Sequence, residues 1–313
     1  MIASDPLEMG TMTPEPSAAA TVKKAITHPN TLFPEFLGLV VRPMGQWAPV
    51  AAMVGLMAEF GYDSSNARAM VARQKNRGWL VAEKRGRVRG YRLGVEAVER
   101  LAASDAYVWH PRELAPLADG WALVTFSVPE AARAKRNLLR SRLNSLGFGT
   151  VGPGALIAPA RMIDVAQGVI ADYDLKQFAD VFRAHLPAGE DAHALIRRGW
   201  DLTAMGDDYR AFIAEYRPVL QFWRDRLAAA SEPDPVPDTE LSREAFRDYV
   251  LAFNRWRRLP LKDPGLPSDL LGPDWAGREA GELFEALVLL LQEPALRFAR
   301  QYWPEEASAG EPG

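Results

Sequence analysis

The chain has 313 residues, a formal net charge of −3 at pH 7 and no cysteine. The length allows two or three domains, and the content of 48% hydrophobic and 25% charged residues is that of an ordinary globular protein. The lack of cysteine excludes disulfides, thiolate metal sites and cysteine nucleophiles.

The first 28 residues are rich in Pro, Ala, Thr and Met and show no period, so we expect a disordered tail over residues 1–28. Asp5 and Glu8 lie where a signal peptide carries positive charge, and no apolar core follows them. No segment approaches the ~20 apolar residues that span a bilayer. We therefore expect a cytoplasmic protein that contacts no membrane.

Residues 29–105 predict a winged helix-turn-helix domain. Two helices, one beginning near Pro49 and one after Asp63, are separated by a turn at Gly61. The second helix has apolar residues on one face and basic residues on the other, as in a helix that enters a DNA groove. Gly78, two β-rich segments and a basic turn follow, and this order predicts a β-hairpin wing.

Positive charge is concentrated in this domain, although the whole chain is slightly acidic. Between Tyr62 and Arg92 there are nine Lys or Arg residues and two acids. Such a patch attracts the phosphate backbone of nucleic acid. The candidate DNA contacts come from the start of the helix, its basic face and the wing turn: Ser64, Ser65 and Asn66; Arg68, Arg73 and Arg77; Arg85, Arg87 and Arg89.

Each of these candidates also has a purely structural interpretation. The polar residues that open the helix can serve only as its caps, and the wing turn can be an ordinary hairpin with charged flanks. Arg68 and Arg73 can form a solvated face, or an internal salt bridge with Glu59 or Glu83.

Residues 118–190 predict a small α/β domain that opens on the β-branched strand WALVTFSVP. Strands and helices alternate in the order β-α-β-α-β, at about residues 121–129, 130–146, 154–159, 161–171 and 178–186. This order favours a ferredoxin-like layer.

The segment from Gly147 to Gly152 matches G-x-G-x-x-G. A dinucleotide-binding loop needs a strand before it and a helix after it, whereas here a helix precedes and a strand follows. We therefore expect a helix cap and a turn rather than a cofactor site.

Strands are no longer predicted after residue 191, and residues 191–304 are expected to form a C-terminal helical domain. Helices are predicted over about 209–228, 243–258 and 277–302, with a Pro-rich loop at 231–240. The expected fold class is thus α+β, with a winged helix, a ferredoxin-like centre and a helical end.

The chain has no pattern that indicates catalysis. GxSxG, HExxH and phosphate-loop motifs are absent from the sequence. His185 and His193 are too loosely spaced for a metal site, and the neighbouring carboxylates are better explained as helix caps and turns: Asp172, Asp174, Asp207 and Asp208. We expect no catalytic residue, no metal and no cofactor, and hence not an enzyme.

Several motifs, in order, resemble the PaaX family of bacterial repressors, named for phenylacetate degradation. They are NARAMVARQKNRGWLVAEKRGRVRGYRL (66–93), GWALVTFSVPEAAR (120–133), LLRSRLNSLGFGTVGPGALIAP (138–159), GWDL (199–202) and RWRRLPLKDPGLPSDLLGPDWAGREA (255–280). The resemblance runs over about residues 35–300, and several separate motifs are more specific than one.

The resemblance implies a winged-helix DNA reader, a central domain similar to the small dimeric CRISPR-associated nucleases, and a homodimer on partly palindromic, double-stranded operator DNA. It also implies that the protein represses an aromatic-compound catabolic operon and is released by an aryl-CoA thioester such as phenylacetyl-CoA. Candidate effector-binding residues are Arg140, Trp256, Arg258 and Trp275.

Three alternatives stay open at this point. The tryptophans among these residues can instead pack between domains. The protein can be a nucleic-acid-binding module without effector control, or an enzyme that acts on an acyl-CoA. Turnover assays and sequence-specific footprinting separate these functions.

Overall fold

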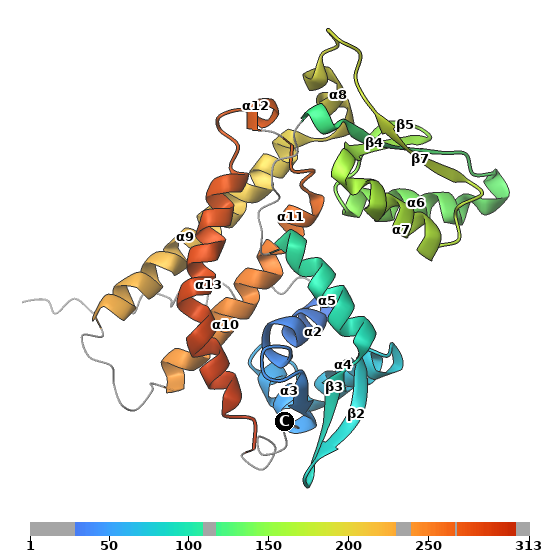
Figure 1. Ribbon diagram of the computed structural model, residues 1–313. Coiled ribbons are helices and arrows are strands. Elements are labelled where there is room, and N and C mark those ends of the chain that lie inside the picture. Colours follow the sequence, from blue (N-terminus) through green and yellow to red (C-terminus); the bar gives the residue numbers. More distant parts are fainter. Residues whose placement is uncertain (1–28, 109–116, 230–238, 267, 305–313) are drawn as a thin grey trace, which may run out of the picture.

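The computed structural model describes residues 29–108, 117–229, 239–266 and 268–304, and its fold is α+β (Figure 1). Helices predominate, and two small antiparallel sheets lie apart from each other. The predicted tail over residues 1–28 and most of the predicted loop over 231–240 lie outside the described residues.

The N-terminal elements form the predicted helix-turn-helix and wing. In chain order they are α2 (Pro29–Phe36), a π-helical turn (Leu37–Val41), β1 (Trp47–Pro49), α3 (Val50–Ala58), α4 (Ser64–Asn76), β2 (Leu80–Arg85), β3 (Val88–Leu93) and α5 (Val95–Val108). Gly61 and Gly78 have positive φ angles of 82° and 77° and end α3 and α4, a conformation that costs glycine little. The three strands pair antiparallel in the order β1-β3-β2.

The central elements form a four-stranded antiparallel sheet with two helices. They are β4 (Trp121–Phe126), α6 (Arg133–Ser145), β5 (Gly149–Gly152), β6 (Ala155–Pro159), α7 (Ile163–Asp172) and β7 (Ala179–Ala184), with single 3₁₀ turns at Leu117–Asp119, Glu130–Ala132 and Ala160–Met162. The strand order β5-β6-β4-β7 and the sequence β-α-β-β-α-β are those of a ferredoxin-like fold. The predicted fold class is confirmed.

Strand β5 corrects the prediction for the G-x-G-x-x-G segment. Gly147 takes a positive φ of 89° and ends α6 as expected, but Gly149 to Gly152 pair with β6 instead of forming only a turn. A Cβ atom on Gly149 would lie 2.7 Å from the carbonyl oxygen of Gly199. This strand is glycine-rich because the chain after α8 (Ala192–Gly199) packs directly onto it.

The two faces of the central sheet are covered by different helices. Helices α6 and α7 lie on one face (Figure 1), where Val124, Leu139 and Leu156 are buried together. On the other face, α8 and Trp200 pack against Trp121. The same apolar cluster includes Leu270 of α12 (Ser268–Leu271). Successive side chains of β4 point to opposite faces, so this strand contributes buried residues to both.

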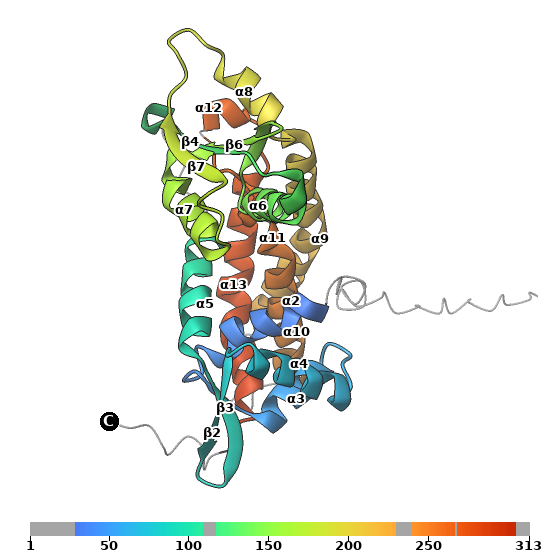
Figure 2. The same cartoon turned by 90° about the vertical axis from the view of Figure 1, so that its right-hand side faces the viewer.

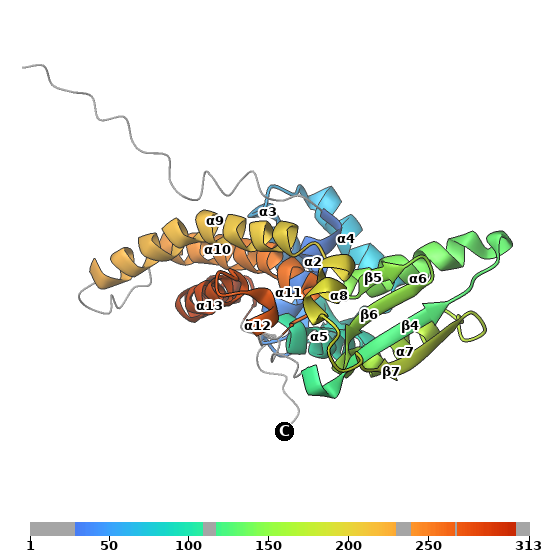
Figure 3. The same cartoon turned by 90° about the horizontal axis from the view of Figure 1, so that it is seen from above.

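Three long helices form the C-terminal part, as predicted. They are α9 (Leu202–Ala229), α10 (Thr239–Trp256) and α13 (Gly277–Arg300), with the short α11 (Arg258–Lys262) after α10. The three lie side by side, with the central sheet to one side of them (Figure 3). In the described residues, no helix is long and apolar enough to cross a membrane.

One apolar core joins the winged helix to the C-terminal helices. It contains buried residues of α2, α3 and α4 together with residues of α9, α10 and α13. Phe60, after α3, lies 5.5 Å from Phe246 of α10, which lies 5.5 Å from Phe298 of α13 (ring centroids). Segments far apart in the sequence therefore bury each other's apolar surface (Figure 2).

Candidate nucleic-acid interface

The start of α4 is fixed by its own cap. The Asp63 carboxylate accepts hydrogen bonds from the backbone N–H of Asn66 and from the Asn66 side-chain amide, both at 2.8 Å. Ser64 and Ser65 are exposed in the first turn, where backbone N–H groups favour a phosphate. Asn66 is exposed too, but its amide already has a partner in Asp63.

The two faces of α4 differ in character as the sequence predicts. Ala67, Met70, Val71 and Gln74 are buried in the core. Arg68 and Arg73 lie on the two flanks of the exposed side, Arg77 follows as the C-cap residue, and all three are exposed to solvent. Within the described part of the chain, these three arginines have no ion-pair partner, so the face holds positive charge that its own fold does not neutralise.

The suggested internal salt bridges of Arg68 and Arg73 do not form, because both acids are taken by other arginines. The Glu59 side chain is buried and pairs with Arg243 at 2.8 Å and Arg247 at 2.7 Å, both from α10. The Glu83 carboxylate pairs with Arg85 at 2.9 Å and with Arg92 at 3.4 Å. Helix α10 thus supplies both partners of Glu59.

The wing is a tight hairpin beside α4. Arg85 pairs with Val88 in the strand register, which leaves a turn of Gly86, at a φ of 56°, and Arg87. Arg87 and Arg89 are exposed at the end of this hairpin. Arginines in such a position suit the negative potential of a narrow minor groove.

Arg85 differs from the other two wing arginines. Its Nε donates to Oε1 of Glu83 at 2.9 Å, and its guanidinium lies 4.9 Å from the ring centre of Trp47. Both contacts are with the wing's own sheet. DNA contact by Arg85 stays a prediction, and the residue already has a structural role next to the turn of the wing.

Strand β1 and Trp47 were not predicted from the sequence. The strand has only three residues, too few for a period, and Trp47 is almost fully buried at 1% exposure. The one available signal was Gly90 inside a strand, which indicates a close approach by another group. A Cβ atom at that position would collide with the Trp47 ring.

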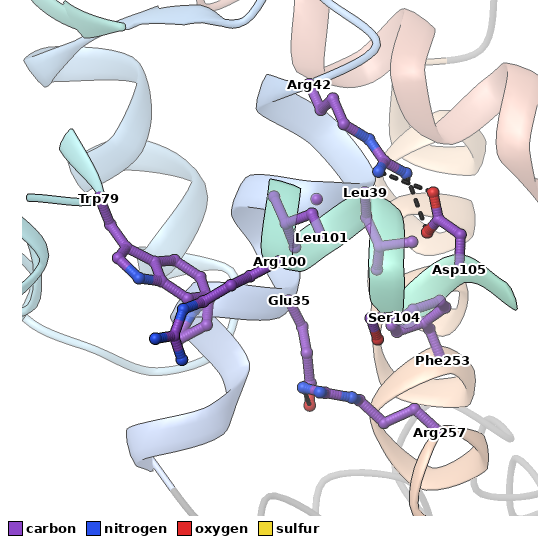
Figure 4. A pocket seen from close by; sticks show the side chains of 12 residues that line it. Glu35, Leu39, Arg42, Trp79, Arg100, Leu101, Ser104, Asp105, Phe253 and Arg257 are labelled. Atoms are coloured by element: carbon purple, nitrogen blue, oxygen red, sulfur yellow. Dashed lines mark hydrogen bonds and ion pairs between the residues drawn. The ribbon is translucent and has the colours of Figure 1, made fainter. Parts of the chain in front are cut away.

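A small pocket lies behind the winged helix, between α2, α5 and α10 (Figure 4). Its volume is about 60 Å³, and Leu39, Leu101 and Phe253 form apolar walls. Trp79, the second residue after the C-cap of α4, also lines it. An engineered cavity that admits benzene measures about 150 Å³, so this pocket is too small for an aromatic ring.

Two ion pairs beside this pocket connect its elements. Arg42 donates two hydrogen bonds to Asp105 of α5, at 2.8 and 3.1 Å (Figure 4). Glu35 of α2 accepts from Arg257 at 3.1 Å and from Asn254. Burial raises the pKa of Glu35, and the Arg257 guanidinium opposes that rise.

The predicted effector-binding residues lie on different elements, and the two tryptophans have aromatic partners of their own. Trp256 is buried, donates its indole N–H to the carbonyl of Val108 at 2.9 Å and stacks on Phe284. Trp275 is half-buried and meets Tyr209 edge-on at 5.7 Å. The packing alternative therefore describes Trp256, and both tryptophans belong to one aromatic cluster around Tyr209.

The two predicted effector arginines lie on elements that touch each other. Arg258 opens α11 and donates to the hydroxyl of Thr31 in α2 at 3.2 Å. Arg140 is half-buried on α6, and α6 contacts α11. The central and C-terminal parts thus touch through the elements that carry these arginines, while the Arg258 side chain itself reaches α2. Among the residues that the structure describes, no group of three His, Cys, Asp or Glu side chains is placed to hold a metal ion.

Three models of PaaX domains match consecutive parts of the chain. The model described as PaaX-like protein matches residues 30–97, the PaaX protein central Cas2-like domain matches 114–196, and the PaaX-like protein C-terminal domain matches 200–301. The first of these matches spans α4 and the wing.

The transcriptional repressor PaaX of Escherichia coli (strain K12) is 25% identical to this chain over 272 residues. The match covers 84% of this chain and 79% of the relative. An uncharacterised protein of Mycobacterium tuberculosis has a similar structure, with a TM-score of 0.52, at 21% identity over 84% of this chain and 96% of that one. At that identity the structural likeness concerns the fold.

Proposed function

This chain belongs to the PaaX family of transcriptional repressors, and from that premise we propose that it binds operator DNA as a homodimer and represses an aromatic-compound catabolic operon. We assign DNA reading to residues 29–105, dimerisation to 118–190 and the response to an effector to the boundary of 118–190 with 191–304. A protein with this role acts in the cytoplasm, where the bacterial chromosome lies.

One observation carries the DNA-reading part of the proposal. The exposed face of α4 presents Arg68, Arg73 and Arg77, which no acid of the described chain neutralises, in a protein with a net charge of −3. Such a face is expected to repel rather than attract basic partners and to lower the energy of a nearby phosphate backbone. An arginine can also bind the O6 and N7 atoms of guanine in the major groove, at about 1–3 kcal/mol of discrimination.

The wing supplies the second contact region. Arg87 and Arg89 lie at the exposed end of the β2–β3 hairpin, and α4 packs beside β2. With α4 in the major groove, the hairpin reaches the adjacent minor groove. Ser64 and Ser65 add contacts to a phosphate at the N-terminus of α4.

We propose that the effector, an aryl-CoA thioester such as phenylacetyl-CoA, binds where α6 meets α11. Arg140 and Arg258 lie on these two elements and are suited to the phosphates of coenzyme A. Trp275 is the half-buried aromatic residue of the late motif and suits an aryl group. Binding there changes the angle between the central domain and the rest, so that two α4 helices no longer match the spacing of the half-sites. A coupling of about 1–3 kcal/mol changes DNA affinity about 5- to 150-fold.

Selection from a random DNA duplex library tests this function. The intact protein is expected to enrich a partly palindromic sequence, and phenylacetyl-CoA is expected to release it in a gel-shift titration. The Arg68→Ala/Arg73→Ala variant serves as the non-binding control. Enrichment of no sequence would overturn the repressor proposal. Enrichment without release by phenylacetyl-CoA would instead identify a DNA-binding protein without this effector.

A further inference from the structure

We propose that the end of α13 and the turn that follows it (residues 298–303) belong to the DNA-reading module, and that Trp303 is a positioning residue for the wing. The proposal rests on the proposed DNA binding. It concerns residues that are more than 200 positions away from the wing in the sequence. Figures 1 and 2 show the end of α13 lying against α3 and the base of the β2–β3 hairpin.

The first contact joins the end of α13 to α3. Tyr302 packs onto Gly55 so closely that a Cβ atom there would lie 2.6 Å from Cε1 of the tyrosine ring. The same ring meets Phe298 edge-on at 5.6 Å between centroids. Glycine in the middle of a helix costs stability, and here it makes room for the aromatic ring.

The second contact closes the free edge of the wing sheet. The indole N–H of Trp303 donates to the carbonyl oxygen of Trp47 at 3.1 Å. The backbone N–H of Leu93 donates to Gln46, so the neighbouring pair Trp47 and Arg92 is a non-hydrogen-bonded pair in this antiparallel ladder. The Trp47 carbonyl therefore points away from β3, and Trp303 provides the partner that a further strand would give.

The third contact carries this constraint across the sheet. The Trp47 ring lies over Gly90 of β3, and its indole N–H donates to the carbonyl of Glu83 in β2 at 3.2 Å. Arg85 covers the same ring and holds the Glu83 carboxylate. The exposed Arg87 follows two residues later. An unbroken series of contacts thus runs from the end of α13 through Trp47 to the turn of the wing.

This series predicts what the loss of one contact does. The shared apolar core holds the module together without Trp303, so the fold survives its loss. Strand β1, however, loses the hydrogen bond that fixes its outer edge. The turn with Arg87 and Arg89 then loses its defined position. DNA affinity then falls because the contacts of the wing are weakened, while the contacts of α4 stay as they are.

The test compares Trp303→Phe, which removes the N–H donor and keeps an aromatic ring, with Gln301→Ala at the neighbouring exposed position. Each intact protein is titrated against the duplex that wild type selects, at several salt concentrations. We expect Trp303→Phe to bind about 3- to 10-fold more weakly, in line with one lost hydrogen bond. The slope of log K against log salt is expected to be shallower by about 1–2 for the lost wing contacts. Gln301→Ala is expected to match wild type.

Non-additivity separates positioning from a general loss of structure. In an Arg87→Ala/Arg89→Ala background, Trp303→Phe is expected to cause no further loss, because the contacts through which it acts are gone. Equal affinity and equal slope for Trp303→Phe and wild type would overturn the proposal. The proposal would also be overturned if Trp303→Phe lowered DNA affinity in the Arg87→Ala/Arg89→Ala background as much as it does in wild type. If wild type selects no duplex, the proposed function itself fails, whatever Trp303 does.

A measurement on the wild-type protein covers the case in which Trp303→Phe unfolds. Amide hydrogen exchange is followed with and without the selected duplex. Coupling predicts that DNA slows exchange in β1 and around residues 298–303 together with the wing, since the same contacts order all three. Protection of the wing alone would contradict the proposal.

Discussion

Wing arginines only two residues apart have different surroundings. Arg85 holds Glu83 and covers the Trp47 ring, whereas the side chain of Arg87 extends into solvent from a two-residue turn. Their shared charge made them equivalent candidates in the sequence. Their environments give one a role in the fold and leave the other free for DNA.

Alanine substitutions at these two positions are therefore expected to act on different properties. Arg85→Ala removes a cation–π contact and a partly buried ion pair, so we expect a loss of about 1 kcal/mol in the free energy of unfolding. Arg87→Ala is expected to leave stability unchanged and to make the salt slope of DNA binding shallower by about 1. Urea unfolding and salt-dependent DNA titrations measure the two effects, and the same pattern in both variants would contradict this assignment.

The candidate residues of α4 were predictable because a short periodic helix carries its own signals. A helix start after Asp63 was expected, with Asp63 or Ser64 as the cap, and Asp63 fills this role; the exposed arginines follow from the period. The partners of Glu59 were not predictable. They come from α10, more than 180 residues later, and nothing local indicates that Arg243 and Arg247 reach this acid.

At the scale of elements, the long helices and the β2–β3 hairpin were predicted, while β1 and β5 were not. Both missed strands have three or four residues, and β5 begins and ends with glycine. Such strands form because neighbouring strands supply their hydrogen bonds and neighbouring helices bury them. Local β-propensity does not predict these tertiary contacts. Helix α9 also begins before the predicted residue 209, because Leu202 and Met205 pack against the cluster that contains Trp200.

Helices α9 and α10 are joined by a buried acid that predicts a pH dependence of stability. Asp248 of α10 accepts a hydrogen bond from the indole N–H of Trp223 at 2.8 Å, and burial raises the pKa of this carboxyl from 3.8 to about 6. The unfolded chain releases this proton first as pH rises. The contribution of the protonated acid to the free energy of unfolding is therefore complete below about pH 4. It is lost by about pH 6, which lowers the free energy of unfolding by up to about 3 kcal/mol.

Asp248→Asn is expected to remove this dependence. The amide oxygen of Asn keeps the acceptor for Trp223 and carries no charge to bury. We expect the variant to be more stable than wild type by about 2 kcal/mol at pH 7 and close to it at pH 4. Thermal unfolding of both proteins at the two pH values measures this. A variant less stable than wild type at pH 7 would show that the buried charge is favourable.

On the scale of the whole molecule, the core does not follow the order of segments in the sequence. Residues of α2, α3 and α4 share one apolar core with α9, α10 and α13, and buried Glu59 and Glu35 are paired with α10 and the turn that follows it. The central sheet has a core of its own between β4 and helices α6 and α7. A periodic pattern tells which residues of a helix are buried, and it does not tell which distant segment covers them.

This arrangement predicts how the protein unfolds. Amides of α3 and α10 are expected to exchange with solvent at the same free energy under mild denaturant, because they open as one unit. Amides of α6 and α7 are expected to open at a different free energy. Hydrogen exchange resolved by segment measures both. Opening of α3 and α4 ahead of α10 and α13 would show that the winged helix is an independent unit.

The central claim is that the exposed arginine face of α4 reads DNA in both halves of a palindrome. Anisotropy titrations of the selected duplex and of a scrambled duplex, with wild type and with Arg68→Ala/Arg73→Ala, test it most directly. We predict that wild type prefers the selected duplex by at least about 10³-fold. The variant is predicted to lose about 10²-fold or more of this preference while its circular dichroism spectrum stays unchanged. An unaltered preference in a folded variant would contradict the account.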